Sequence, residues 1–374
     1  MIRRYFRNSV LLFFMSLMAL PAFAQDEEEM SRFFREKDWV TWQQGVEHPD
    51  TVKKLFIRDK SPLDYEMLKK FTSLEGLIVY ESPLPSLDFL ADFPAIKVLE
   101  FQGNTLRSLE GIQTLEKLEE FSCNANFVRD LSPLDSLLKL TMIHVYDNDV
   151  ESLEPIGHLP NVTRLDISRN NIRSLKPIAN WTDLTYLSVY NCINLLDISE
   201  VENFKLLKHL NISFLDIPDF SLEMIKDHDS LTNLRIQGMV KSNEELQYIM
   251  HHTQLVQITM GKNDSVTTLD SLRYLDKLKY LDIHSNNISD LSPLNNFPKL
   301  VKLVAYRNQI QDISVLLNCK ELHSAFIHEN PIKDYSPLFQ MGYLQYLSLD
   351  RSDFSKIQVI ELKRALDKTS VSFY

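Results

Sequence analysis

Apolar residues recur along this chain with a period of 22 residues. The pattern reads L-x-x-L-x-L-x-x-N-x-[IVL]-x-x-L-x-x-[LI], as in IKVLEFQGNTLRSLEGI at 96–112 and VTRLDISRNNIRSLKPI at 162–178. About fourteen units follow it between residues 52 and 355. Agreement in both period and residue type over this length predicts a solenoid, in which each unit buries its apolar residues against its neighbours.

Each unit contains the elements of a leucine-rich repeat. The L-x-L segment alternates with period two, which predicts a short strand with leucines inward and x residues outward. The second half, often D-[LI]-S-P-[LI], predicts an extended or 3₁₀ return, where proline is tolerated. The sequence therefore predicts an α/β leucine-rich repeat solenoid. A curved parallel sheet should line its concave side, with 3₁₀, extended and short helical returns on its convex side.

The ninth position of the unit is usually asparagine. Its side-chain amide both donates and accepts, so it can satisfy backbone groups where the strand turns inward. We interpret this series as a structural asparagine ladder, formed by Asn104, Asn126, Asn148, Asn170, Asn286, Asn308 and Asn330.

Stacked repeats need a cap at each end. At the N-terminal end, residues 25–51 contain SRFFREKDWVTWQQGVEH (31–48), whose Trp39, Trp42 and Val46 fall on one face of a predicted helix. At the C-terminal end, residues 356–374 contain a predicted helix, 356–368, and a final alternating segment, VSFY, that can add an edge strand.

The units that start at 207, 231 and 255 depart from the pattern. They lack the D-x-S-P return and contain helix-like segments such as SNEELQYIM (242–250), with Ser242 and Glu245 spaced as a capping box. This irregular region, 207–277, is either a functional bend or drift among repeats.

Residues 1–24 have the three regions of a secretory signal peptide. Arg3, Arg4 and Arg7 precede an apolar run that is too short to span a bilayer, and Ala22-Phe23-Ala24 supplies a small-x-small cleavage site. No later apolar run is long enough to span a membrane. We therefore expect export to the periplasm, the cell surface or the medium, with no transmembrane segment after cleavage.

The composition of the chain argues against several classes of protein. The formal net charge of −11 argues against nucleic-acid binding, which relies on clustered Lys and Arg. The eight glycines are few for a doubly wound or β-barrel enzyme with many Gly-dependent loops. Cys123, Cys192 and Cys319 are an odd set that predicts buried thiols rather than a disulfide framework.

The repeat resembles the 22-residue leucine-rich repeats of bacterial internalins and of a eukaryotic phosphatase-regulating subunit. Together with LDISRNNIRSLKPI (165–178), the N-terminal segment and HPDTVKKLFI (48–57) look like those of exported leucine-rich repeat proteins of Gram-negative bacteria. The resemblance covers nearly all of the chain after residue 24. It implies a concave sheet that holds a protein or peptide partner.

Strand residues that point to the concave side form two aromatic patches. Tyrosine and histidine on a rigid sheet offer a large contact area with little entropy to lose, which interfaces favour. The alternative is that aromatic residues simply suit strands. One predicted partner-binding patch comprises His144, Tyr146, Tyr186 and Tyr190, and the other comprises Tyr280, His284, Tyr306, Phe326, His328 and Tyr346.

Metal and catalytic motifs are absent from the sequence. The segment DNDVE (147–151) resembles the start of a calcium loop, but Ser152 and His158 stand where glycine and glutamate are required. The concave histidines lack the spacing of zinc ligands, and no hydrolase or phosphate-binding motif occurs. We expect no metal, no cofactor and no catalytic residue.

The sequence thus predicts a non-catalytic, monomeric binding protein that recognises a protein or peptide on its concave face. One alternative is a glycan-binding or glycan-processing envelope protein that uses the irregular repeats 207–277. Another is a structural component of the cell envelope.

Overall fold

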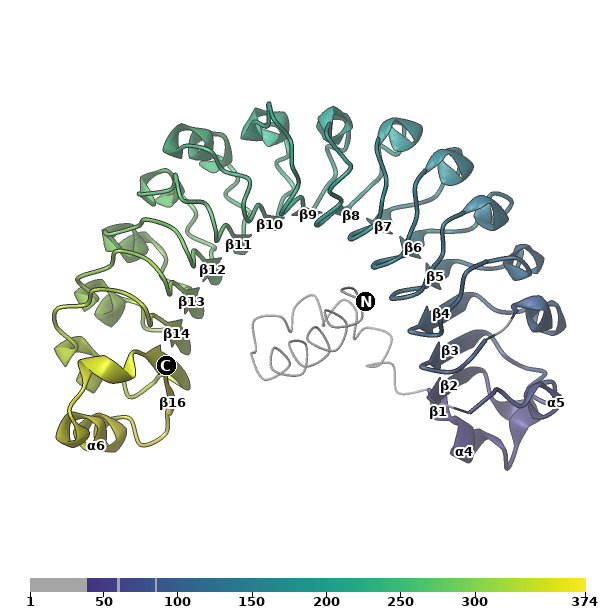
Figure 1. Cartoon of the computed structure of the whole chain (residues 1–374), viewed down its shortest axis with the longest axis horizontal. Helices are drawn as coiled ribbons and strands as arrows, with labels where there is room; N and C mark the ends of the chain where they lie inside the picture. Colours follow the sequence, from purple (N-terminus) through teal and green to yellow (C-terminus); the bar gives the residue numbers. More distant parts are fainter. Residues whose placement is uncertain (1–38, 59–60, 85) are drawn as a thin grey trace, which may run out of the picture.

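The computed structural model describes residues 39–58, 61–84 and 86–374, so the predicted signal peptide lies outside the described residues. The described chain forms one arc with a single parallel sheet on its concave side, in which each strand lies beside its neighbours in sequence (Figure 1). The strands are β1 (Val40–Thr41), β2 (Lys54–Arg58), β3 (Gly76–Tyr80), β4 (Val98–Gln102), β5 (Glu120–Ser122), β6 (Met142–His144), β7 (Arg164–Asp166), β8 (Tyr186–Ser188), β9 (His209–Asn211), β10 (Asn233–Arg235), β11 (Gln257–Thr259), β12 (Tyr280–Asp282), β13 (Lys302–Val304), β14 (Ser324–Phe326), β15 (Tyr346–Leu349) and β16 (Ser370–Phe373).

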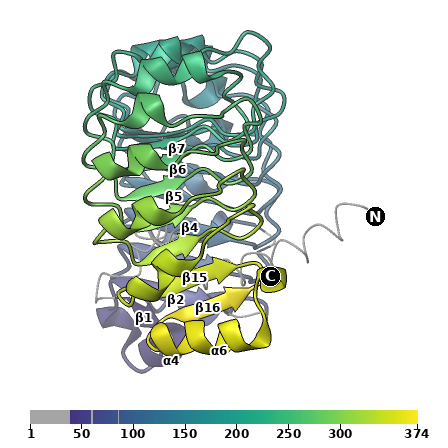
Figure 2. The same ribbon diagram turned by 90° about the vertical axis from the view of Figure 1, so that its left-hand side faces the viewer.

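The convex side consists mainly of short 3₁₀ returns, and the described residues are mostly non-helical. Helices α4 (Trp42–Gly45), α5 (Tyr65–Leu68) and α6 (Lys356–Ala365) lie near the two ends of the arc, and Figure 2 shows α6 beside β16. The 3₁₀ returns are η1 (Pro49–Thr51), η2 (Asp88–Asp92), η3 (Ile112–Thr114), η4 (Ser132–Leu134), η5 (Glu154–Ile156), η6 (Lys176–Ile178), η7 (Ser199–Asn203), η8 (Leu222–Ile225), η9 (Asn243–Ile249), η10 (Asp270–Leu272), η11 (Ser292–Asn296), η12 (Ser314–Asn318), η13 (Ser336–Gln340) and η14 (Arg351–Asp353).

The core lies between the sheet and these returns, as the alternation predicts. In the seventh strand, Leu165 and the following Ile167 are fully buried, whereas Arg164 and Asp166 are only partly buried on the concave side. Burying each aliphatic side chain contributes about 2 kcal/mol, and every unit supplies several. Strands β2 to β15 correspond to the fourteen predicted units, which confirms the leucine-rich repeat fold.

The asparagine ladder forms as expected. Asn126 Nδ2 donates to the carbonyl of Phe101, and its Oδ1 accepts from the backbone N–H groups of Asn104 and Leu106 in the preceding unit. Cys192, which stands at an asparagine position, donates its thiol to the carbonyl of Ile167. The ladder also includes Asn263, which the sequence pattern did not identify. It is interrupted at Leu215 and Met239, the ninth residues of the units that start at 207 and 231.

The eighth residue of twelve consecutive units has a left-handed backbone conformation. Only Gly103 and Gly238 are glycines; the other ten carry side chains at φ between 53° and 57°. A side chain at such a φ costs about 1–2 kcal/mol in the folded state. The members are Glu81, Gly103, Ala125, Asp147, Arg169, Asn191, Phe214, Gly238, Lys262, Ser285, Arg307 and Glu329.

The irregular repeats contain 3₁₀ turns where the sequence suggested helices. Residues Asn243–Ile249 form η9, and Ser242 makes no side-chain cap, so the predicted capping box is wrong. The Glu245 carboxylate instead accepts from the backbone N–H of Leu222 at 2.6 Å and from the Ser221 hydroxyl at 3.0 Å. The same spacing therefore serves a contact between repeats, because a 3₁₀ turn points Glu245 toward the neighbouring unit.

The N-terminal cap differs from the predicted helix. Residues 31–38 lie outside the described residues, and Val40–Thr41 form a strand that pairs with β2 before α4 begins. The exposed edge of β2 offers backbone hydrogen bonds, which explains why this segment is extended. Trp42 then stacks on Phe71 with ring centroids 5.6 Å apart and covers the first unit.

The C-terminal helix and strand are both present. Helix α6 begins at a capping box formed by Ser355 and Gln358, buries Leu362 and ends at Ala365, three residues earlier than expected. Strand β16 pairs in parallel with β15, as the alternation in VSFY predicted. The three cysteines are free, buried thiols, and burial raises the pKa of each.

Candidate binding surface

The register of the sheet arranges the concave side chains in three rows, at the third, fifth and seventh positions of the unit. Pairing aligns Tyr280, Lys302, Ser324 and Tyr346 in the third-position row, and Asp282, Val304, Phe326 and Ser348 in the fifth-position row. A position in the repeat therefore fixes a place on the surface, and residues distant in sequence become neighbours.

In the seventh-position row, His284, Tyr306 and His328 form a continuous ring stack. His284 and Tyr306 have centroids 4.8 Å apart, Tyr306 and His328 4.7 Å apart, and both pairs are nearly parallel. Tyr374 extends the stack, lying 4.2 Å from His328. Tyr374 lies beyond the last repeat, so its position in the sequence could not assign it to this row. With Tyr280, Lys302, Phe326 and Tyr346, these rings make up what we call the C-terminal aromatic surface.

The histidines of the stack are held by hydrogen bonds at their Nδ1 atoms. His284 Nδ1 lies 2.6 Å from Asp282 Oδ1, and His328 Nδ1 lies 2.6 Å from the Ser348 hydroxyl. Burial lowers the pKa of His328 and raises that of Tyr306 to about 12, so the Tyr306 hydroxyl stays protonated at neutral pH. The rings thus stand in fixed orientations before any partner arrives.

The predicted histidines His144, His284 and His328 are less exposed than the sequence pattern suggested, at 6%, 7% and 8%. Near-parallel rings cover His284 and His328, whereas His144 meets Tyr186 at a tilt of 39°. The tyrosines and Phe326 are partly exposed and present most of the accessible ring area.

The other predicted patch divides into separate contacts. His144 and Tyr186 lie 5.7 Å apart, and Tyr186 also contacts His209, a third-position residue not predicted for the site. Tyr146 packs under Arg169, and Tyr190 meets Phe214 edge-on. Burial and, as the smaller cause, the charge of Arg164 together lower the pKa of His144 to about 3, which keeps this ring neutral. These residues lie in strands β6 to β9 or just after them, and Figure 1 shows these strands near the middle of the arc.

Lys302 is a site residue that was not predicted from the sequence. It is 4% exposed on the concave face, with its ammonium 5.1 Å from the centre of the Phe326 ring. Burial lowers its pKa to about 8, an effect that the charge of Asp282 partly offsets. Its third position in the unit places it beside Tyr280 in the same row, but a lysine there gives no aromatic signal in the sequence.

Near the N-terminal end of the concave face, Tyr80 donates its hydroxyl to Glu100 at 2.5 Å. Glu100 is buried, and this burial raises its pKa to about 7. The contact joins neighbouring strands β3 and β4 and is structural.

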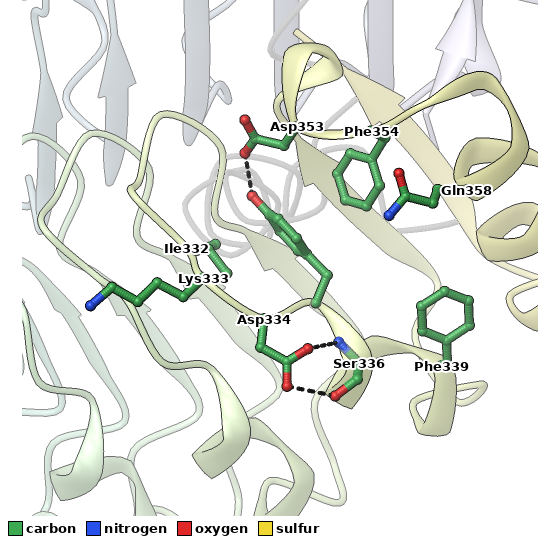
Figure 3. Close-up of a pocket in the computed structure, with 9 residues that line it drawn as sticks. Ile332, Lys333, Asp334, Ser336, Phe339, Asp353, Phe354 and Gln358 are labelled. Carbon is green, nitrogen blue, oxygen red and sulfur yellow. Dashed lines mark hydrogen bonds between the residues drawn. The ribbon is translucent and has the colours of Figure 1, made fainter.

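A cavity of about 500 Å³ lies away from the concave rows, at the C-terminal end of the arc (Figure 3). Phe339, Phe354 and Gln358 line it, together with Tyr335, which donates its hydroxyl to Asp353. The Asp334 carboxylate is occupied by the backbone N–H and hydroxyl of Ser336. None of the predicted partner-binding residues lines this cavity. On the concave face, a hollow beside Tyr186 and His209 measures about 10 Å³, about the space of one water molecule.

Two further properties bear on function. In the described ranges, no three or more His, Cys, Asp or Glu side chains converge as metal ligands would. No helix in the same ranges combines the length and apolar character needed to cross a membrane.

Comparison with known proteins agrees with this architecture. A family model described as leucine-rich repeats, two copies, matches residues 276–318. No curated protein matches the chain. An internalin, InlF, of Listeria monocytogenes has a similar solved structure, with 24% identity and a TM-score of 0.67, covering 83% of this chain and 89% of InlF. A leucine-rich repeat protein of Leptospira interrogans has 16% identity and a TM-score of 0.62, and the match covers 89% of this chain and 98% of the Leptospira protein.

A plant peptide hormone receptor, RGFR1, solved in complex with RGF2, has 18% identity and a TM-score of 0.55. The match covers 79% of this chain and 57% of the receptor. At these identities the likenesses show the fold alone. The chain has the leucine-rich repeat fold in an arrangement like that of bacterial internalins.

Proposed function

We propose that this leucine-rich repeat solenoid is a non-catalytic protein that binds a protein or peptide partner on its concave face. The observation that carries the proposal is the C-terminal aromatic surface, where the stack of His284, Tyr306, His328 and Tyr374 is fixed before binding. Ordered rings lose little conformational entropy when a partner packs on them, so most of the contact energy remains available for binding.

The shape of the concave face favours a polypeptide over a small ligand. In the described residues, sixteen parallel strands form a long open surface, and the hollow near its centre holds about one water molecule. Small-molecule sites are usually enclosed clefts of about 300–1,000 Å³. The solved complex of the plant peptide hormone receptor with RGF2 is an example of a ligand-bound protein of this fold. The comparisons lend no support to the glycan alternative.

The same reasoning favours a binding role over catalysis. The irregular repeats, which the enzyme alternative would use as an active site, contain Glu245, whose carboxylate is occupied by Leu222 and Ser221. Their buried His228 and His252 belong to the core and are closed to substrate. Purified protein screened against hydrolase substrates should show no turnover; activity that a Glu245→Gln substitution abolishes would support the enzyme alternative.

We further propose export, on the basis of the signal-like segment 1–24. Expressed in a Gram-negative host, the full chain should accumulate outside the cytoplasm, shortened at Ala24, whereas residues 25–374 alone should remain inside. Retention of the uncut full chain in the cytoplasm would contradict export without affecting the binding proposal.

Capture of a partner tests the binding surface. Residues 25–374 are immobilised, incubated with envelope and culture fractions, and the retained proteins are identified by mass spectrometry. The double substitution Tyr306→Ala and Phe326→Ala should reduce retention at least about tenfold, because it removes the central rings of the surface. Tyr274→Ala is the matched control, since this tyrosine is 56% exposed and lies outside the concave rows. Equal retention by the double variant, with an unchanged circular dichroism spectrum, would overturn the surface assignment.

A further inference from the structure

Lys302 is a buried cation without a counterion contact. It is 4% exposed, and within the described part of the chain its ammonium makes neither an ion pair nor a hydrogen bond. The ammonium lies over the face of the Phe326 ring, 5.1 Å from its centroid. A cation held in this way retains only part of the stabilisation that water would give it.

None of the groups described around Lys302 forms an ion pair with its ammonium. Asp282, whose charge acts on Lys302, already holds both the Nδ1 and the backbone N–H of His284 through its Oδ1. In the strand register, Lys302 pairs with Tyr280 on one side and with Ser324 on the other, and Tyr346 follows Ser324. The ammonium is therefore flanked along its row by neutral side chains.

We propose that Lys302 receives the carboxylate side chain of an aspartate or glutamate in the protein or peptide partner. This inference rests on the proposed function and adds the chemistry of the partner to it. Charge complementarity carries the argument: an acidic side chain placed over Tyr280, Lys302 and Phe326 would give the ammonium the ion pair that the chain itself does not supply. In a partly desolvated setting, such a charge-assisted contact is stronger than one in open water.

The acidic group is assigned to a side chain rather than to a chain end. The sheet continues on both sides of Lys302, through β12 toward the middle of the arc and through β14 and β15 toward its C-terminal end (Figure 1). A polypeptide can therefore cross Lys302 and keep contact in both directions. The aromatic rings around it would take the apolar residues that flank the acidic one.

Peptide selection provides the test. A library of random peptides, displayed on phage with their C-termini fused to the coat protein, is selected against residues 25–374. The same library is selected against three variants: Lys302→Met, Lys302→Glu, and Tyr306→Ala with Phe326→Ala. The fused C-termini exclude free terminal carboxylates, so any acidic preference must come from side chains.

Peptides selected by the unmodified protein should carry Asp or Glu at one recurring position. This preference should disappear with Lys302→Met and change to Lys or Arg with Lys302→Glu. For one selected peptide, replacing its Glu by Gln, or its Asp by Asn, should weaken binding at least about tenfold to the unmodified protein and have little effect with Lys302→Met. A coupling of this kind identifies the pair directly.

The outcomes separate the two proposals. Peptides that require Tyr306 and Phe326 but show no acidic position, or that keep the same acidic position with Lys302→Met, would overturn the role of Lys302 and leave the binding surface intact. A selection that yields no peptide dependent on Tyr306 and Phe326 would count against the surface itself and against this inference with it. Lys302→Met keeps an unbranched side chain one atom shorter than lysine, and its thermal unfolding serves as the control for folding.

Discussion

The rings of Tyr306 and His328 lie parallel to within 9°, with their centroids 4.7 Å apart. Tyr306 presents its opposite face to His284, so one tyrosine joins two histidines that belong to units 44 residues apart. Rings in consecutive units can stack because the sheet spacing of about 4.8 Å is close to the separation that aromatic pairs prefer. The repeat thus supplies the geometry, and the residue types at the seventh position decide whether a stack forms.

Tyr306→Ala should lower the free energy of unfolding by about 1–3 kcal/mol, since it removes both stacking contacts along with buried ring area. Tyr306→Phe should cost less than about 1 kcal/mol, because the ring remains and the hydroxyl makes no hydrogen bond within the described part of the chain. Urea unfolding followed by circular dichroism measures both. Equal losses for the two substitutions would mean that the hydroxyl, not the stack, stabilises this row.

Lys302→Met should stabilise the protein at pH 7 by about 1–3 kcal/mol, because it replaces a buried charge by an apolar chain of similar length. The folded pKa of about 8 is below the usual 10.5, so the unfolded chain binds more protons between these values. Stability of the unmodified protein should therefore rise relative to Lys302→Met as the pH increases from 8 to 10.5. Unfolding in urea at pH 7 and pH 10.5 checks this; a pH-independent difference would contradict it.

Asn148→Ala should destabilise the fold by about 2–4 kcal/mol. It would leave the buried N–H of Val128 and the carbonyl of Cys123 without their amide partner. Asn171→Ala is the control, because this neighbouring asparagine lies outside the ladder positions. Should the two substitutions have equal effects on the urea midpoint, the ladder would have no special role in stability.

His252→Leu should stabilise the protein by about 1–2 kcal/mol, since neither ring nitrogen of this buried histidine has a hydrogen-bond partner of ordinary geometry among the described residues. Burial, and the charge of His228, lower the pKa of His252. The unfolded chain then binds more protons below about pH 6.5, so the unmodified protein loses stability as the pH falls. His252→Leu should reduce this loss between pH 7 and pH 5, whereas the exposed neighbour His251→Leu should not.

Ala125→Gly should raise the free energy of unfolding by about 0.5–1 kcal/mol, because φ at this position is 53° and glycine adopts that conformation without strain. Ala125→Val should lower the free energy of unfolding, because a β-branched side chain is more strained at this φ. Differential scanning calorimetry of both variants would measure the effect, and a lower melting temperature for Ala125→Gly would show that the left-handed position carries no strain.

The repeat positions were predictable from sequence because packing enforces them. Leu165 and Ile167 must be apolar to fill the core, and Asn126 must be an amide to satisfy the turn, so both leave a periodic signal. The left-handed conformation at the eighth position gives almost no periodic signal in the sequence, because glycine occupies that position only at Gly103 and Gly238. Its strain is small enough for ten other residues to be tolerated there.

The candidate site was less predictable because its contacts depend on which side chains meet. Tyr374 lies beyond the repeats, so no periodicity places it against His328. The Ser242 and Glu245 spacing fits a helix cap and a contact between repeats equally well, and the 3₁₀ backbone decides between them. His284 and His328 are buried because neighbouring rings stack on them, and the order of residue types along the row does not reveal that stacking.

The interruption of the asparagine ladder at Leu215 and Met239 has a mechanical consequence. Ladder amides tie each unit to the one before it, and three consecutive units near the middle of the arc have Cys192, Leu215 and Met239 in place of the amide. Sulfur makes the weaker contacts of Cys192 and Met239 with the preceding unit, and Leu215 makes none of this kind. A solenoid bends most easily where its units have the fewest hydrogen bonds to one another. The width of the opening between the two ends of the arc should therefore respond most to Leu215 and Met239, although neither belongs to the C-terminal aromatic surface.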